Sequence, residues 1–214
     1  MRQPNPLKVL TFPERVYCVD VCGPMAVVTT ADRSIHVYRL DPEPTEYKKI
    51  DSLLKYQHRS LAIFTDKSGI PNGFAIGSIE GRAAIMYVDA KNPSVDNFTF
   101  KCHRSNPGNN TTVQDIYAIN DINVHPIHGS LSTVGSDGRY NFWDKDERTK
   151  LKTSDVVNNQ PITCSAIDHT GNVFAYANGY DWHKGHEGNS SSMKPAIFLR
   201  PCFDEMKTKP KKSN

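Results

Sequence analysis

The 214-residue sequence lacks several features by which common protein classes are recognised. It has only five cysteines and no C-x-x-C pair, which argues against a disulfide or zinc scaffold and favours buried thiols in a reducing compartment. The first residues carry no apolar stretch, so no secretory leader is expected. The longest uncharged apolar run, residues 21–31, is about half as long as a membrane span, so we expect no membrane insertion.

Strong charge and catalytic motifs are missing as well. The formal net charge is +3, which is too weak to indicate nucleic-acid binding by itself. The chain contains no G-x-S-x-G, no glycine-rich phosphate loop and no H-E-x-x-H. We therefore expect a protein that is not an enzyme and that needs no cofactor.

Two short segments carry metal-ligand residue types. In the first, His125 and His128 fall where one strand turns into the next, which favours a pair of turn histidines over a metal site. The second, residues 181–187 (DWHKGHE), is predicted to be a loop that packs Trp182 and satisfies its polar groups locally. We expect no metal at either segment.

The sequence does contain an internal repeat of β-rich runs around polar turns. Acidic residues recur in these turns at Asp32, Glu80 and Asp137, and an arginine follows each of them closely. The third repeat ends in Trp143-Asp144, as is typical of a WD-repeat blade, a sheet that buries both faces against its neighbours. We expect each acidic residue to hold its turn through hydrogen bonds to the backbone or to a neighbouring side chain.

The repeat predicts an all-β WD-repeat propeller. Its four units are expected at about residues 13–53, 58–103, 115–154 and 160–203, with residues 4–12 as the outer strand of a preceding blade and residues 204–214 as a basic disordered tail. Further outer strands are expected at Thr45–Leu53, Asn97–His103 and Thr149–Thr153. Because propellers have about four to eight blades, residues 1–203 are expected to form about four to five blades of a larger, N-terminally incomplete ring.

Aromatic and basic residues gather in the second and third units. They are Arg82, Phe100, Lys101, His103, Arg104, Trp143, Lys145, Arg148 and Lys150. Such a mixture suits an acidic peptide or stacked single-stranded bases. From spacing alone, however, the favoured interpretation places Phe100 and Trp143 in the core and the charges in a solvated rim.

Several strings resemble the mRNA export propeller of the nuclear pore, the RAE/GLE family. They are residues 79–82 (IEGR), 96–104 (DNFTFKCHR), 134–139 (VGSDGR), 142–146 (FWDKD), 150–153 (KLKT) and 180–187 (YDWHKGHE). The likeness runs from about residue 4 to residue 200. The spindle-checkpoint propellers of the BUB type share the S-I-E-G-R and F-K-C-H-R strings, so they are the alternative family.

The resemblance implies a non-enzymatic, seven-bladed adaptor for mRNA export that binds the GLEBS peptide of a nucleoporin. It implies a place in the nucleus at the nuclear pore and also in the cytoplasm, with a further role in spindle assembly through mitotic spindle or checkpoint proteins. It also implies a basic-aromatic groove that contacts the peptide and, directly or indirectly, RNA. The matching groove residues are Arg82, Phe100, Trp143, Arg148 and Lys150.

Two consequences follow from this resemblance. It moves Phe100 and Trp143 from the core to a surface groove. A seven-bladed ring needs roughly 7 × 45 residues, so about two to three blades are expected to lie upstream of this sequence. The alternative is a checkpoint-type scaffold that recruits mitotic kinases through GLEBS-like peptides.

Overall fold

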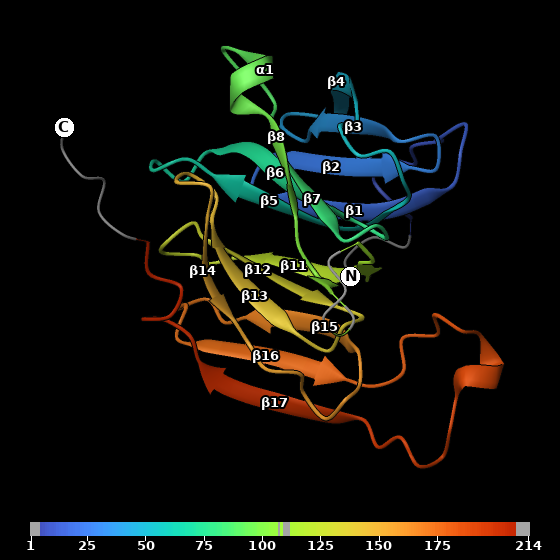
Figure 1. The fold of residues 1–214 in the computed structure, drawn as a ribbon. Coiled ribbons are helices and arrows are strands. Elements are labelled where there is room, and N and C mark those ends of the chain that lie inside the picture. The colour runs from blue at the N-terminus through green and yellow to red at the C-terminus, as the bar shows by residue number, and fades with distance from the viewer. Residues whose placement is uncertain (1–4, 107, 109–111, 209–214) are drawn as a thin grey trace.

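The computed structural model describes residues 5–106, 108 and 112–208, and it is built almost entirely of antiparallel β-sheet (Figure 1). Three four-stranded sheets follow one another along the chain, and a three-stranded sheet comes last. Within each sheet the strands pair in sequence order, which is the meander of a propeller blade. The all-β propeller architecture is therefore confirmed. None of the helices in the described part of the chain is long and apolar enough to cross a lipid bilayer.

We name the four sheets blades A to D. Blade A contains β1 (Val16–Cys22), β2 (Met25–Thr30), β3 (Ser34–Arg39) and β4 (Thr45–Asp51). Blade B contains β5 (His58–Thr65), β6 (Pro71–Ser78), β7 (Arg82–Tyr87) and β8 (Phe98–Lys101). Blade C contains β11 (Ile119–Val124), β12 (Leu131–Gly135), β13 (Tyr140–Asp144) and β14 (Thr149–Thr153). Blade D contains β15 (Ile162–Ile167), β16 (Val173–Asn178) and β17 (Ala196–Pro201).

Three smaller features lie in the connections between these strands. The two-residue strands β9 (Arg104–Ser105) and β10 (Asp115–Ile116) pair between blades B and C. The short helix α1 (Pro93–Asp96) joins β7 to β8, and a 3-10 turn, His186–Gly188, lies between β16 and β17. The repeat pattern of the sequence did not predict any of these elements.

The blades stack because their middle strands are buried on both faces. Every residue of β2, β12 and β13 is buried, so the middle strands of blades A and C are covered on both faces. Phe74 and Met86 of blade B pack toward blade A, whereas Ile85 of the same blade packs toward blade C. The first strands β1, β5, β11 and β15 lie side by side in that order, so the blades are arranged around a common axis (Figure 1).

Carboxylates join the innermost strands of neighbouring blades. Asp20 of β1 accepts the backbone N–H of Ile63 in β5 at 2.7 Å. Asp121 of β11 accepts the backbone N–H of Ser165 in β15 at 2.8 Å. Burial raises the pKa of Asp121, although hydrogen bonds to its carboxylate oppose that rise. These bonds supply polar contacts between blades where no backbone ladder connects them.

The acidic turns behave as expected in blades A and C. Asp32 accepts hydrogen bonds from the hydroxyl groups of Thr30 and Ser34 at 2.5 and 2.8 Å, and together with the Ser34 N–H these bonds lower its pKa to about 2. Asp137 accepts the N–H of Arg139 at 3.1 Å. The expected role of the acidic residue is confirmed at both turns.

The turn of blade B is built differently. There the hydroxyl of Ser78 accepts the N–H of Glu80 at 3.4 Å, and the Glu80 carboxylate lies 4.0 Å from Nε of Arg82. A glutamate side chain is one methylene longer than aspartate, so it extends past the turn toward this arginine. The expected hydrogen bond from the acidic side chain is therefore not confirmed at Glu80, whose carboxylate only approaches Arg82.

The two ends of the chain differ from the expectation. Residues 5–12 form no strand; instead Leu10 and Phe12 pack beside Tyr38 of blade A. Residue 4 of that predicted strand lies outside the described residues. The tail begins later than residue 204, because Met206 is fully buried in blade D and its carbonyl accepts the hydroxyl of Ser130 at 2.7 Å. Residues 209–214 of the predicted tail lie outside the described residues.

Candidate functional site

Four of the five residues predicted for the groove lie along the junction between blades B and C, and the fifth, Arg82, does not. Phe100 belongs to β8 and Arg82 begins β7, while Trp143 and Lys150 oppose each other across β13 and β14. Arg148 occupies the turn between those two strands, with a positive φ of 54°. The outer strand of blade B thus faces the third and fourth strands of blade C.

An aromatic row forms the centre of this junction. The ring centroids of Phe98 and Phe100 lie 6.2 Å apart, and those of Phe100 and Trp143 lie 4.7 Å apart. Both phenylalanines are half-buried, whereas Trp143 is only 8% exposed and packs in the core between the blades. The surface position expected for Trp143 is therefore wrong, since the indole lies in the core with little of it open to a ligand, and the aromatic row joins that core to the surface.

A chain of hydrogen bonds fixes the indole in place. Nε1 of Trp143 donates to Oγ1 of Thr133 at 3.0 Å, and that hydroxyl lies 2.9 Å from Nε2 of His103. Nδ1 of His103 lies 2.8 Å from the carboxylate of Asp137. Because a carboxylate only accepts, the network assigns the proton to Nδ1, and the threonine hydroxyl then donates to Nε2. The chain runs from the turn of blade C to the candidate groove.

Two cations cover the outer faces of this aromatic row. The guanidinium of Arg148 lies 4.3 Å from the ring centroid of Phe98, and Nζ of Lys150 lies 5.1 Å from that of Trp143. Both side chains are exposed, so they can move without disturbing the core. The junction therefore offers exposed positive charge directly above aromatic surface.

Arg82 is the predicted groove residue that the structure separates from the others. It pairs with Lys101, and its guanidinium donates to Oγ1 of Thr99 at 3.1 Å. Successive residues of a strand point to opposite faces, so this face of β8 is the one opposite to Phe98 and Phe100. The structure brings together Phe100, Trp143, Arg148 and Lys150. It places Arg82 on the opposite face of the sheet that β7 and β8 form.

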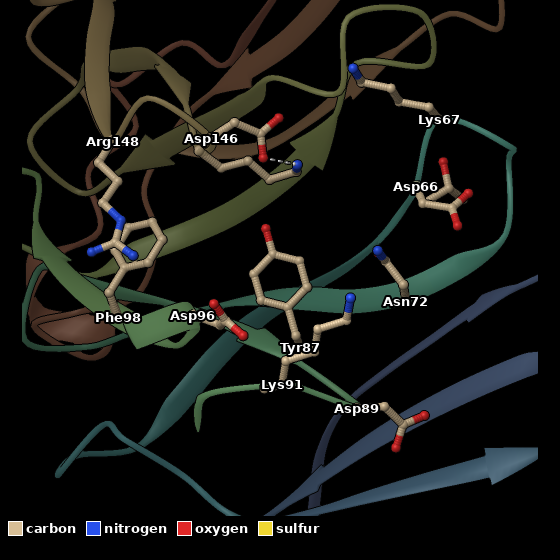
Figure 2. A pocket seen from close by; sticks show the side chains of 13 residues that line it. Asp66, Lys67, Asn72, Tyr87, Asp89, Lys91, Asp96, Phe98, Asp146 and Arg148 are labelled. Carbon is tan, nitrogen blue, oxygen red and sulfur yellow. Dashed lines mark hydrogen bonds and ion pairs between the residues drawn. The ribbon is translucent and has the colours of Figure 1, made fainter. Parts of the chain in front are cut away.

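A pocket of about 560 Å³ opens at the end of the groove, beside Phe98 and Arg148 (Figure 2). Its lining mixes four aspartates with four cations, and the Tyr87 side chain stands among them. Sequence reasoning missed Phe98 and Tyr87 as site residues. Phe98 could have been found, because it lies two positions before Phe100 in a strand and so shares its face.

The two segments with metal-ligand residue types have structural roles. The rings of His125 and His128 stack at 4.5 Å, and Nε2 of His125 bonds the carbonyl of Gly171 at 2.9 Å. The buried carboxylate of Asp181 holds its loop to blade C through Ser136. The ring of Trp182 lies 5.6 Å from that of Tyr180 within the loop but the side chain is 59% exposed, so the predicted packing of this residue holds only in part. The described residues contain no group of three or more side chains placed to hold a metal ion.

Comparison with known proteins identifies close relatives of the whole chain. No family model matches it. It is 58% identical over 211 residues to proteins named mRNA export factor from Danio rerio and from Xenopus tropicalis, a match that covers 99% of this chain and 57% of each relative. The mRNA export factor of Mus musculus is 58% identical over 208 residues, covering 97% of this chain and 56% of the relative.

The chain thus spans a little over half the length of the curated relatives it matches. The match runs through all four blades and includes the residues that build the aromatic row. By sequence and by fold, the chain belongs to the RAE/GLE family of mRNA export factors.

Proposed function

We propose that the chain is part of a non-enzymatic adaptor for mRNA export, which binds an acidic nucleoporin peptide of the GLEBS type through the junction of blades B and C. The relatives' name supports the export role. The observation that carries the binding site is the pair of exposed cations, Arg148 and Lys150, lying over the aromatic row. An export role places the protein in the nucleus, at the nuclear pore, and also in the cytoplasm.

The geometry suggests how such a peptide is held. An apolar side chain of the partner takes the place of a cation against Phe98, Phe100 or the edge of Trp143. The displaced Arg148 and Lys150 then turn toward carboxylates that flank the apolar residue. Charge-assisted bonds from arginine to carboxylate are about twice as strong as neutral ones, so acidic flanks compensate for the lost cation–π contacts. Arg82, held on the opposite face of β8, would contact only a peptide that wraps around that strand.

The test is a titration of the purified chain with an acidic, methionine-containing peptide. We expect saturable binding that fails when the methionine is replaced by serine or the acidic residues by their amides. Binding that is indifferent to both replacements would contradict the groove. The same peptide should compete with a full-length GLEBS segment if the two share this surface.

RNA is the second partner expected at this surface. Phosphates can replace carboxylates opposite the same cations, and bases can stack on exposed aromatic rings. Direct contact requires that RNA affinity fall steeply as salt rises, because each neutralised phosphate releases counterions. An affinity that does not change with salt would remove direct RNA binding from the proposal and leave RNA association to the partner.

The alternative function is a checkpoint-type scaffold that recruits mitotic kinases or spindle proteins through related peptides. It is favoured by the strings at residues 78–82 and 100–104, both of which lie at the junction of blades B and C. A pull-down with nucleoporin and kinase GLEBS peptides in direct competition separates the two functions. Recovery of the kinase peptide alone would favour the checkpoint scaffold.

A further inference from the structure

The pocket beside Phe98 is formed by three connections that meet at one end of the junction. Residues 66–70 join β5 to β6, residues 88–97 join β7 to β8, and residues 145–148 join β13 to β14; Asn72, Tyr87 and Phe98 line the pocket from the ends of the adjoining strands. Tyr87 lies against Phe64 in an edge-to-face contact with ring centroids 5.2 Å apart. With Phe98 it gives the pocket an aromatic wall (Figure 2).

Four carboxylates line this pocket, and two of them have no cationic partner. Asp66 accepts the backbone N–H groups of Ser68 and Ile70 at 2.8 and 3.0 Å, and Asp96 accepts that of Asn92 at 3.0 Å. In the described residues, no lysine, arginine or histidine nitrogen lies within 4.0 Å of either carboxylate. Both are bound only to their own loops, so they can accept further donors.

The charges that act on the tyrosine are predominantly negative. Burial raises the pKa of Tyr87, and Asp146 and Asp96 raise it further, with Arg148 alone acting in the opposite direction. Lys145 lines the pocket, but its charge is already paired and it does not face an incoming ligand as an unpaired cation. Its side chain is 7% exposed, pairs with Asp146 at 2.8 Å and lies over the ring of Phe64. A cation placed beside the phenol would therefore be stabilised.

One residue that lines the pocket, Asn72, has a buried side-chain oxygen without a hydrogen-bond donor among the described residues. The Asn72 side chain points into the pocket in Figure 2, and its Oδ1 is buried with no hydrogen-bond partner in the part of the chain that the structure describes. A buried amide oxygen without a donor is unfavourable, because it has lost its hydrogen bonds to water and gained none in return. Rotation of the amide would turn this oxygen toward the pocket, where an N–H group of a ligand could satisfy it.

The same end of the molecule already shows how it binds an arginine. The guanidinium of Arg39 lies 3.7 Å from the ring centroid of Tyr47, and the hydroxyl of that tyrosine donates to Asp89 at 3.0 Å. Asp89 also lines the pocket beside Phe98. Next to the pocket, this chain therefore already stacks a guanidinium on an aromatic ring whose hydroxyl is bonded to a carboxylate.

We propose that this pocket binds an arginine side chain of a partner protein, with the guanidinium against Tyr87 and between Asp96 and Asp146. The methylene groups of the arginine would lie along Phe98, and Asn72 would accept a further N–H bond. Lys67 and Lys91, which also line the pocket, would face acidic neighbours of that arginine in the partner. The proposal does not depend on the export function, although one peptide could occupy both the groove and the pocket.

Nuclear magnetic resonance of the isotope-labelled chain tests the proposal with capped tripeptides, glycine-X-glycine. With arginine at X, we expect saturable shifts of the amide signals around Tyr87 and Asp96. Citrulline has nearly the same shape without the charge and should bind about tenfold more weakly, and glutamate should cause no shifts there. Equal affinity for arginine and citrulline, or binding of the glutamate peptide in the pocket, would overturn the proposal.

The matched variants are Asp96→Asn and Asp155→Asn, which remove the same charge inside and outside the pocket. Asp155 is exposed and does not line the pocket. We expect Asp96→Asn to weaken arginine binding by about fivefold or more and Asp155→Asn to leave it unchanged. Equal effects of the two variants would also overturn the proposal. The comparison of arginine with citrulline uses the unchanged chain, so it stays decisive even if Asp96→Asn fails to fold.

Discussion

The indole N–H of Trp143 donates a hydrogen bond to the hydroxyl of Thr133 at 3.0 Å, inside blade C. The same indole packs against Phe100 of blade B and lies beneath Lys150. The Trp143 side chain therefore stabilises blade C and also forms part of the candidate groove. A Trp143→Ala variant would disturb both at once, so the two roles are better separated through the neighbours of Trp143.

Thr133→Val tests the structural role of this bond. Valine keeps the shape of threonine but leaves the Trp143 N–H without an acceptor and removes the donor to His103. We expect the free energy of unfolding to fall by about 1–3 kcal/mol, because all three groups are buried. Thr133→Ser keeps the hydroxyl and should lose less. Chemical denaturation measures both variants, and a loss in Thr133→Val no larger than that in Thr133→Ser would show that the hydrogen bond contributes no more to stability than the packing of the methyl group.

Sequence reasoning could reach the propeller because its repeat has a local cause. Turn residues such as Asp32 and Asp137 bond their immediate neighbours, so their spacing in the chain reports the spacing of the blades. Runs of apolar, small and β-branched residues, such as residues 25–30, likewise reveal strands that are buried on both faces. By contrast, the ordered position of Met206 depends on a contact with Ser130, which lies far away in the sequence.

The candidate site was predicted only in part for the same reason. Resemblance supplied Phe100, Trp143, Arg148 and Lys150, which the fold does bring together. It could not reveal that Arg82 faces away from the aromatic row, since that depends on the register between β7 and β8. Nor does any local pattern show that three separate connections meet to form the pocket beside Phe98.

Gly81 holds the turn from which Arg82 begins β7, and we expect its replacement to be costly. Its φ is +59°, and an added Cβ would lie 2.7 Å from the carbonyl oxygen of Cys102 and 2.9 Å from that of Tyr117. Gly81→Ala should therefore destabilise the chain by about 2 kcal/mol or more. Gly69→Ala is the matched control, because it has a φ of +77° and no atom within 4 Å of the added Cβ.

Thermal and chemical unfolding of the two glycine variants separate backbone strain from steric overlap. Gly69→Ala should show only the strain, about 1 kcal/mol. If both variants lost the same stability, the contacts of Gly81 with Cys102 and Tyr117 would not constrain this turn.

His58 should make stability depend on pH. It is 1% exposed, and burial, with a smaller contribution from the charge of Arg33, lowers its pKa to about 4. In the unfolded chain the pKa is about 6.5, so its contribution to stability is complete above that pH and is lost as the pH falls toward 4. The full loss corresponds to about 3 kcal/mol.

The variant that tests this dependence is His58→Gln. Its free energy of unfolding should fall less than that of the unchanged chain between about pH 7 and pH 4.5. The difference between the two chains isolates His58 from the carboxylates, which titrate in both. Parallel pH profiles would mean that His58 accepts a proton equally well in the folded and unfolded states.

Removal of the cations that cover the aromatic row should change peptide affinity in opposite directions for two kinds of peptide. Arg148→Gln keeps most of the side-chain length but removes the charge above Phe98. An acidic, methionine-containing peptide should lose about 2 kcal/mol of binding free energy, about thirtyfold in affinity, because its carboxylates lose their partner. An uncharged peptide with the same methionine should bind as well or better, because no cation–π contact has to be broken.

Lys49→Gln serves as the control for this pair of measurements, because Lys49 is an exposed lysine of β4 in blade A, away from the junction. It should leave both affinities unchanged at moderate salt. The effect of Arg148→Gln on the acidic peptide should also shrink as salt rises, since exposed charges are screened. If Arg148→Gln weakened both peptides equally, the arginine would be part of the apolar surface itself, and the cation would not be displaced when a partner binds.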